Sequence, residues 1–308
     1  MGLPYQLLAA SDIMKLKNII ISFLIVLLYN SCDKIEGPYR EAVVVNDFCT
    51  TGIEDSIPSR KVLVEDYTGH LCGNCPAAGI FLNDTLKELY GHCLVVISVH
   101  AGFFAGTCPS AAACPNNQPS GSFTTDFTTP SGTAWNTFFG IVGNPKGMIN
   151  RIDYPSGTHS KALTAWSSAV ASELAKPVNA KIEITNTFNV ASNSVNIAVK
   201  SDFLEDLPGD YKLQVVITED NLVDWQEWYF HTPEFVPDYV HHHVLRDVVN
   251  STWGEDIANG GVTSGTSITK NYTKSLNSTW IADECNIVAF IYKSDTYEII
   301  EVSEKAVK

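Results

Sequence analysis

The chain has 308 residues, 45% of them hydrophobic and 18% charged, and this length predicts two globular domains besides any targeting segment. That apolar content excludes a disordered chain, and a total of 20 Gly and 14 Pro excludes a collagen-like repeat. The formal net charge of -14 makes the surface repel phosphate backbones, so no nucleic-acid partner is expected.

The N-terminal region predicts export from the cytoplasm and a lipid anchor. A short apolar run, Ile19 to Leu28, follows Lys15 and Lys17 and is too short to cross a bilayer core about 30 Å thick. A basic segment followed by such a run is typical of a secretory signal. Cys32 closely follows the run, as in a bacterial lipobox, in which the cysteine becomes lipid-modified. Ordinary cleavage that leaves Cys32 free is the alternative.

The stretch from Val62 to His100 predicts a strand, a helix and a second strand. A β-branched run, Val62 to Val64, leads through a turn into a helix with Pro76 in its first turn, where the missing N–H is harmless, and Gly91 after its end. The run Cys93 to His100 is almost wholly apolar, as expected of a strand covered on both faces. A Cys-x-x-Cys motif at the start of a helix between two strands indicates a thioredoxin-like βαβ unit.

Cys72 and Cys75 are the candidate catalytic residues. Cys72 is expected at the N-terminus of the helix, where unpaired N–H groups favour the thiolate that attacks disulfides. Cys75, one turn further along, would resolve the mixed disulfide. Two other interpretations stay open: an inert structural disulfide, and a zinc site that would need His70 or Cys49 as further ligands. We expect no metal and no cofactor.

Cys108 and Cys114 lie in a segment with the composition of a loop, and we expect them to form a structural disulfide that stabilises it. If Cys32 carries a lipid, seven of the eight cysteines remain, so at least one thiol is unpaired. No partner can be assigned from the sequence to the other three, Cys49, Cys93 and Cys285.

The second half of the chain changes its apolar period. The segment Ser160 to Lys176 predicts a helix that Pro177 ends, because apolar residues recur every three or four positions. After it, apolar and polar residues alternate in short runs, and the C-terminus predicts a hairpin of Asn286 to Tyr292 with Tyr297 to Val302. Six or seven such strands predict an antiparallel, immunoglobulin-like β-sandwich. The alternating runs are Ile182 to Phe188, Val195 to Val199 and Leu213 to Ile217.

Two clusters in this half have functional interpretations. Neighbouring residues on a strand point to opposite faces, so in the His241-His242-His243 run at most His241 and His243 converge, and no Cys or carboxylate spacing completes a metal site. We expect a surface or strand-edge role for them. A group of aromatic residues is expected to pack between domains, with a peptide- or glycan-binding platform as the alternative. These aromatic residues are Trp225, Trp228, Tyr229 and Phe230.

The stretch from Val62 to Cys75 resembles the thioredoxin motif, in which an apolar strand with a buried acid leads into the active-site Cys-x-x-Cys. Asp66, six residues before Cys72, stands at the position of that acid, and Glu65 is the neighbouring candidate. The resemblance implies that Asp66 relays protons to the cysteine pair. The dipeptide between the two cysteines is Gly-Asn, where the family has Gly-Pro.

The thioredoxin family also has a cis-proline opposite the dithiol, and the stretch from Val142 to Pro145 resembles that loop. The resemblance implies that Pro145 is cis and that Asn144, with Gly143, could pair backbone groups with an incoming chain that carries a disulfide. The stretch from Ala101 to Ile141 is far longer than in thioredoxin and is expected to be an insertion that is mostly loop.

A wider resemblance covers about residues 60–308. The stretch Glu65 to Pro76 resembles the N-terminal signature of the Omp28 (28-kDa outer membrane protein) lipoprotein family, and Tyr239 to Arg246 and Ile287 to Tyr292 resemble its C-terminal signatures. This resemblance implies a lipoprotein of the outer membrane, on its periplasmic or its surface face. It implies location and architecture more firmly than activity.

Together these features predict an α/β thioredoxin-like domain followed by an antiparallel, immunoglobulin-like β-sandwich domain. The expected order begins with a leader and signal peptide (1–31) and a tether (32–59). The thioredoxin-like domain (60–177) follows, with its insertion at about 101–141, and then the β-sandwich domain (178–308).

Two functions are compatible with these features. In the first, the protein exchanges disulfides with envelope proteins or peptides: Cys72 attacks, Cys75 resolves, Asp66 relays protons, and Asn144 and Pro145 hold the substrate. In the second, it is a non-enzymatic binding or structural lipoprotein whose Cys72–Cys75 pair is a permanent disulfide. In both, the lipid anchor holds the protein at the outer membrane.

Overall fold

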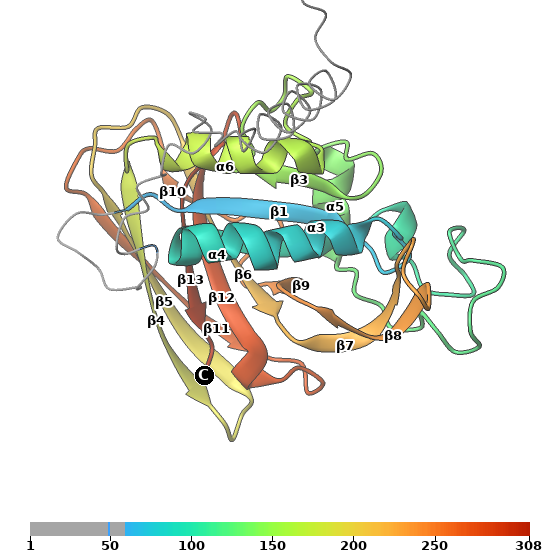
Figure 1. Ribbon diagram of the computed structural model, residues 1–308. Coiled ribbons are helices and arrows are strands. Elements are labelled where there is room, and N and C mark those ends of the chain that lie inside the picture. Colours follow the sequence, from blue (N-terminus) through green and yellow to red (C-terminus); the bar gives the residue numbers. More distant parts are fainter. Residues whose placement is uncertain (1–48, 50–58) are drawn as a thin grey trace, which may run out of the picture. The chain divides into compact units, whose positions relative to one another are not determined.

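The computed structural model describes Cys49 and residues 59–308 (Figure 1). The predicted signal peptide (1–31), the lipidation site Cys32 and nearly all of the predicted tether (32–59) lie outside the described residues. Within the described part of the chain, no helix is both long and apolar enough to span a membrane.

A mixed sheet forms the centre of the described fold, with the strand order β13-β12-β6-β9-β2-β1-β3 and β10 paired to β6. β1 is parallel to β2, whereas β3 runs antiparallel along the other edge of β1. β9 joins the two halves of the chain, since it is parallel to β2 and antiparallel to β6. The strands are β1 (Val62–Thr68), β2 (Leu94–His100), β3 (Lys146–Ile149), β6 (Tyr211–Glu219), β9 (Val244–Val248), β10 (Glu255–Ala258), β12 (Cys285–Lys293) and β13 (Ile299–Ala306).

Helices cover both faces of the β1–β2–β3 part of the sheet, which is why β1 and β2 are buried along their whole length. On one face, apolar residues of α3 (Cys75–Phe81), the π-helical turn η1 (Leu82–Leu86), α4 (Lys87–Tyr90) and α6 (Trp166–Leu174) pack on alternate residues of the strands. On the other face, α5 (Pro130–Phe138) buries Trp135. Short 3₁₀ turns are η2 (Gly91–Cys93), η3 (Phe103–Ala105), η4 (Leu163–Ala165) and η5 (Ala282–Glu284).

Of the two predicted helices, the first ends where expected and the second is shorter. The first helix ends before Gly91, which adopts a φ of 47° directly after Tyr90. The helix expected over Ser160 to Lys176 is shorter, since Lys161 forms an extended bridge with Gly147 and helical structure starts only at η4. The insertion is mostly loop, as expected, but it also contains α5, whose first turn is capped by the Thr129 side chain.

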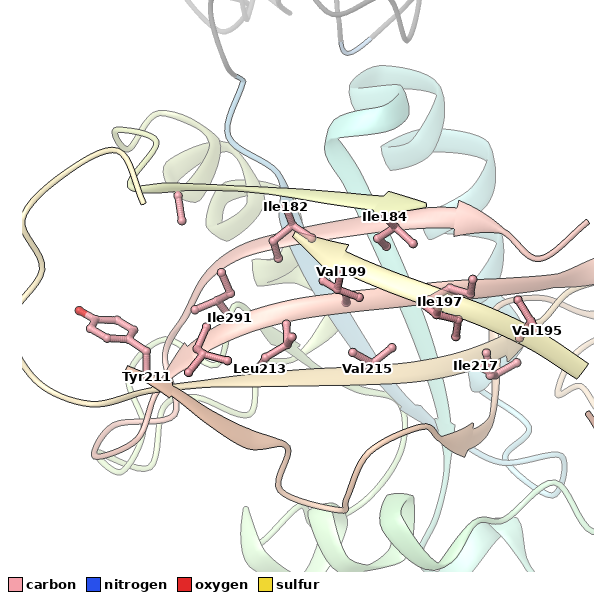
Figure 2. Packing of buried hydrophobic residues seen from close by; sticks show 14 of the residues in the cluster. Ile182, Ile184, Val195, Ile197, Val199, Tyr211, Leu213, Val215, Ile217 and Ile291 are labelled. Atoms are coloured by element: carbon pink, nitrogen blue, oxygen red, sulfur yellow. The ribbon is translucent and has the colours of Figure 1, made fainter. Parts of the chain in front are cut away.

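A second, three-stranded sheet packs against the mixed sheet (Figure 2). It consists of β4 (Ala180–Asn189), β5 (Ser194–Phe203) and β11 (Ser267–Ser275), in the order β11-β5-β4. The alternating residues that predicted β4 and β5 point inward and meet those of β6, which confirms the period-two interpretation for these strands; β11 was not predicted. The labelled side chains of this core are Ile182, Ile184, Val195, Ile197, Val199, Tyr211, Leu213, Val215, Ile217 and Ile291.

The described fold is therefore α/β with a large β-rich part, as predicted at this level. β7 (Leu222–Glu227) and β8 (Phe235–His241) form a separate two-stranded hairpin, and β12 with β13 forms the expected C-terminal hairpin. The predicted domain limit after residue 177 falls between α6 and β4, inside one compact unit, and the mixed sheet contains strands from both sides of it. The thioredoxin-like and immunoglobulin-like assignments stay predictions.

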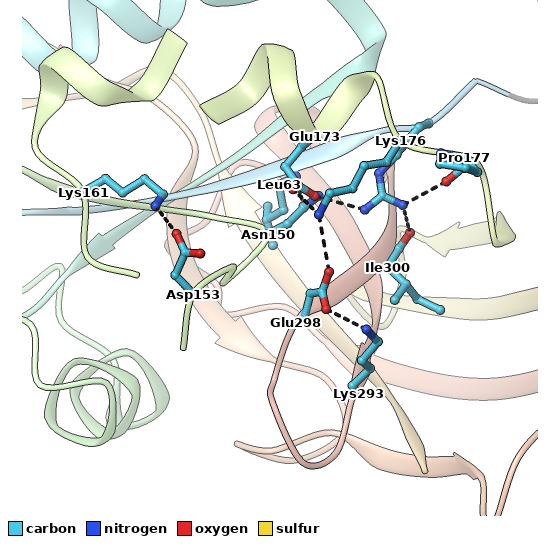
Figure 3. Close-up of polar contacts among 11 residues, drawn as sticks. Leu63, Asn150, Asp153, Lys161, Glu173, Lys176, Pro177, Lys293, Glu298 and Ile300 are labelled. Carbon is cyan, nitrogen blue, oxygen red and sulfur yellow. Dashed lines mark hydrogen bonds and ion pairs between the residues drawn. The ribbon is translucent and has the colours of Figure 1, made fainter. Parts of the chain in front are cut away.

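A polar network joins the start of β1, the end of α6 and β13 (Figure 3). Arg60, which is buried, donates to Glu173 at 3.1 Å and to the carbonyl of Ile300 at 2.9 Å. Asn150 donates to the same Glu173 carboxylate at 3.0 Å and accepts from the backbone N–H of Leu63 at 2.9 Å. The network thus attaches the C-terminal strand to the first strand through buried, charge-assisted hydrogen bonds.

A second buried ion pair lies inside the sheet core. The Arg151 guanidinium donates two hydrogen bonds to Glu65 on β1, at 2.7 and 2.8 Å, with side-chain exposures of 2% and 1%. Four aromatic rings surround the guanidinium with centroids 5.0 to 5.6 Å away, and they come from α5, the residue after it, and β12. These rings belong to Trp135, Phe139, Phe290 and Tyr292.

We predict that Arg151→Ala lowers the free energy of unfolding by about 3–5 kcal/mol, because it leaves the Glu65 carboxylate buried without a partner. Urea unfolding measures the loss. The matched control is Lys212→Ala, which breaks a surface pair whose side chains are 29% and 54% exposed and should cost less than about 1 kcal/mol. Equal losses in the two variants would contradict a structural role for the buried pair.

Candidate functional site

The Cys72–Cys75 pair lies beyond the C-terminal end of β1, and it is oxidised to a disulfide. The chain turns there through backbone hydrogen bonds from Cys72 N to Gly69 O, at 3.0 Å, and from Cys75 N to Cys72 O, at 2.9 Å. α3 starts only at Cys75, followed by Pro76, and its N-cap is Asn74. The position expected for Cys72, at the helix N-terminus, is therefore wrong: Cys72 lies in the turn two residues before the N-cap.

The other cysteines divide into structural pairs and one buried thiol. Cys108 and Cys114 form the expected disulfide, and Cys49 pairs with Cys93, which the sequence could not assign. Cys285 is free and buried, and burial raises the pKa of its thiol to about 12. A thiol with such a pKa is protonated at neutral pH, so Cys285 is not a nucleophile.

The structure separates the two candidate acids of β1. Consecutive strand residues face opposite sides of a sheet, so Glu65 points to Arg151 and Asp66 points to the side of the disulfide. Asp66 is 3% exposed, and its Oδ1 has no hydrogen-bond partner among the described residues. Desolvation by burial raises the pKa of Asp66 to about 7. Asp66 therefore lies on the side of the disulfide, and its role as the acid of the cysteine pair stays a prediction.

Asp66 and Cys75 line one small cavity of about 30 Å³. His100, at the end of β2, and His241, at the end of β8, line the same cavity. Both ring nitrogens of His100 and Nε2 of His241 lack hydrogen-bond partners within the described residues. The volume is large enough for roughly one or two water molecules, and polar groups surround it. Sequence analysis did not identify His100 as a site residue. Its position at the C-terminal end of β2, which is parallel to β1, could have placed it beside the end of β1.

Of the surface or strand-edge role expected for His241 and His243, the surface part is wrong, because these residues are only 5% and 8% exposed. His241 does end β8, a strand of the two-stranded hairpin. Burial lowers the pKa of His241 to about 4 and that of His243 to about 3. Their rings have different neighbours, although both residues line the cavity: His241 lies 5.0 Å from the ring of Phe127, whereas His243 Nε2 is 3.2 Å from Asn83 Oδ1. Across the described residues, no group of three or more His, Cys, Asp or Glu side chains is arranged to hold a metal ion.

The loop before β3 has the conformation that the resemblance implies. The Asn144–Pro145 peptide bond is cis, and Gly143 has a φ of 74°. Because β3 is antiparallel to β1, with Lys146 opposite Tyr67, this loop lies at the end of the sheet from which the disulfide emerges. Asn144 donates from Nδ2 to the carbonyl of Ala101 at 3.5 Å. The loop and the Cys-x-x-Cys turn therefore lie at the same end of the sheet, beyond the C-terminal end of β1.

The end of β7 and the turn after it cover the disulfide. Glu227 N donates to His70 O at 2.9 Å and Tyr229 N donates to Gly73 O at 2.8 Å. The Tyr229 ring lies so close to Gly73 that a Cβ there would be 2.3 Å from it, so only glycine fits. Cys72 is 2% exposed and Cys75 is 4% exposed.

The expected packing of the aromatic segment against the first predicted range, 60–177, holds for Tyr229 and Trp225. Tyr229 rests on the Cys-x-x-Cys turn, Trp228 stacks on His231 with centroids 4.3 Å apart, and Trp225 contacts Phe123. Packing between domains is wrong for Phe230, which is fully exposed.

Fold and site together define a β-rich α/β protein with a covered Cys-x-x-Cys disulfide at one edge of its mixed sheet. The model of a protein family described as outer membrane protein Omp28 matches residues 132–308. This is more than half of the chain, so the protein belongs to the Omp28 family of outer membrane proteins. A comparison with curated protein sequences found no match.

Two solved structures, both from Porphyromonas gingivalis, are similar to the chain. HBP35 has a TM-score of 0.58 at 13% identity, covering 82% of this chain and 77% of its own. A domain of the outer membrane lipoprotein Omp28 has a TM-score of 0.30 at 20% identity, covering 43% of this chain and 91% of its own. At 13% identity, the likeness to HBP35 concerns the fold alone.

We predict that Asp66→Asn removes a pH-dependent loss of stability. The folded state raises the pKa of Asp66 from 3.8 to about 7, so between these values the folded protein retains a proton that the unfolded chain has released. Stability contributed by this group is therefore present below about pH 4 and is lost as the pH rises to about 7.

In urea unfolding, wild type and Asp66→Asn should match near pH 4. The variant should be more stable at pH 8, by a difference on the order of 4 kcal/mol. A difference that does not change with pH would contradict the raised pKa.

Proposed function

We propose that this outer membrane protein exchanges disulfides with envelope polypeptides through Cys72 and Cys75, and that a lipid on Cys32 anchors it. The observation that carries this proposal is the Asp66 carboxyl group, which is buried, lacks a partner on Oδ1 and lines the same cavity as Cys75. A permanent disulfide would not require such an acid, since burying an uncompensated carboxyl group costs stability.

A pKa of about 7 suits Asp66 to proton transfer at the pH at which thiols exchange. When Cys75 leaves as a thiolate, the protonated carboxyl group can supply its proton. In the reverse direction, the carboxylate can accept the proton of the Cys75 thiol. The cis-proline loop supports the proposal because it offers the backbone of Gly143 and Asn144 to an incoming chain at the same edge of the sheet.

The reaction starts from the oxidised pair in the structure. A thiolate of a partner dithiol attacks Cys72 Sγ, the Cys72–Cys75 bond breaks, and Cys75 leaves as a thiolate that takes a proton from Asp66. The second partner thiolate then attacks the partner sulfur of the mixed disulfide and releases Cys72. The partner dithiol is oxidised to a disulfide, and the Cys72–Cys75 pair is reduced. The reverse sequence, with Cys72 attacking a partner disulfide and Cys75 resolving it, reduces the partner.

The alternative is a non-enzymatic outer membrane protein with a permanent Cys72–Cys75 disulfide. One observation favours it: Cys72 is only 2% exposed, and the Tyr229 ring lies on the neighbouring Gly73, so a thiol has little access to the sulfur. The two functions differ in redox poise, because a permanent disulfide resists reduction down to potentials below about -300 mV, whereas exchanging pairs lie higher.

The test is equilibration of residues 33–308 against glutathione buffers, followed by transfer of disulfides to a fluorescent dithiol peptide. We expect a potential above about -300 mV, loss of transfer in Cys72→Ala, and transfer about a hundredfold slower at pH 7 in Asp66→Asn. A double variant, Cys49→Ala with Cys93→Ala, is the matched disulfide control and should keep the wild-type rate, because this disulfide lies before the start of β2, at the other end of the sheet. A pair that no glutathione buffer reduces would establish the permanent disulfide instead.

A further inference from the structure

The segment that covers the disulfide interacts with the Cys-x-x-Cys turn as a bound strand would. Its two donors, the N–H groups of Glu227 and Tyr229, are two residues apart, which is the spacing of strand groups that point to one side. They meet the carbonyls of His70 and Gly73 on either side of Cys72. An extended peptide is held at a sheet edge in the same way, by backbone hydrogen bonds from every second residue.

Side chains complete the contact. Gln226 donates from Nε2 to the carbonyl of Cys72 at 3.1 Å, and the Tyr229 ring covers Gly73. The Glu227 side chain is only 6% exposed, and burial with the nearby charge of Glu234 raises its pKa to about 6. The contact therefore resembles a small protein–peptide interface with an aromatic anchor.

This segment belongs to a hairpin that is fixed at its base and weakly held at its tip. β7 and β8 pair only with each other and do not join either larger sheet, and isolated two-stranded hairpins are marginally stable. At the base, Trp225 and Phe235 both pack on Phe123. Beyond the base, the hairpin tip (Gln226–Glu234) contacts the turn through two backbone hydrogen bonds, the Gln226 amide and the Tyr229 ring, and it carries the fully exposed Phe230.

The geometry points to a binding site for an extended polypeptide segment beside Cys72, which the hairpin tip fills until a partner displaces it. The partner offers two strand N–H groups for the His70 and Gly73 carbonyls and an aromatic side chain for the place of Tyr229. This inference rests on the proposed exchange function and adds its substrate class: extended, aromatic-containing segments with a thiol or disulfide. Glutathione is too short to replace both backbone hydrogen bonds and the ring.

The cover is tested first, by the rate at which glutathione reduces the Cys72–Cys75 disulfide. Tyr229→Ala should speed reduction roughly tenfold, because it removes the ring over Gly73 and frees the tip. Phe230→Ala is the matched control, since its side chain is exposed and touches nothing that holds the tip. Equal reduction rates in wild type and Tyr229→Ala would contradict the inference that the hairpin tip covers the disulfide.

The partner site is tested on the wild-type chain with a synthetic peptide copy of residues 224–231. The peptide carries cysteine at the position of Gln226, whose amide reaches the Cys72 carbonyl. Its thiolate should form a mixed disulfide with Cys72 at least about tenfold faster than glutathione at equal thiolate concentration. N-methylation of the two donor nitrogens should abolish that advantage.

Hydrogen exchange gives a readout that needs no variant of the protein: the amides of Glu227 and Tyr229 should exchange faster when the peptide is bound. A peptide that reacts no faster than its N-methylated form, with unchanged exchange at these amides, would overturn the partner site. If no thiol reduces the disulfide even in Tyr229→Ala, the proposed exchange function fails instead, so the two failures are distinguishable.

Discussion

Side-chain alternation along β1 places two neighbouring carboxyl groups in opposite environments. Glu65 enters the core, where an isolated carboxylate would be costly, and the Arg151 guanidinium compensates it inside a ring of aromatic side chains. Asp66 enters the other side, where no cation meets it, and its pKa rises instead. β1 therefore supplies two carboxyl groups with different roles. Glu65 pairs with Arg151 among aromatic rings that include those of α5 and β12, and Asp66 lies on the side of the disulfide.

The site depends on both halves of the chain. The residues that the Omp28 family model matches, 132–308, include the cis-proline loop, Arg151 and the hairpin tip, whereas Cys72, Cys75 and Asp66 precede them. The mixed sheet makes this combination possible, because β9 continues the sheet from β2 and thereby brings the β7–β8 hairpin to the Cys-x-x-Cys turn. Removing either half would leave an incomplete site.

Local signals in the sequence predicted local structure well. The apolar runs of β1 and β2, the disulfide of Cys108 with Cys114 and the C-terminal hairpin all follow from spacing or period. Long-range pairing does not, because a period of two does not specify which strand lies beside β6 or β9. The burial of His241 was not predicted for this reason, because it depends on a hairpin that packs over a distant turn. Nothing local distinguishes Arg151 from a solvated arginine.

The Cys49–Cys93 disulfide changes how the protein would bear mechanical load. It links the chain upstream of β1 covalently to the residue that precedes β2, across 44 positions of sequence. With the proposed lipid on Cys32, a pulling force from the membrane would pass at Cys49 to the start of β2, an interior strand flanked by β1 and β9. β1 lies between the two linked cysteines in sequence and would not carry that force. The fold would then withstand the pull without relying on the hydrogen bonds of its first strand.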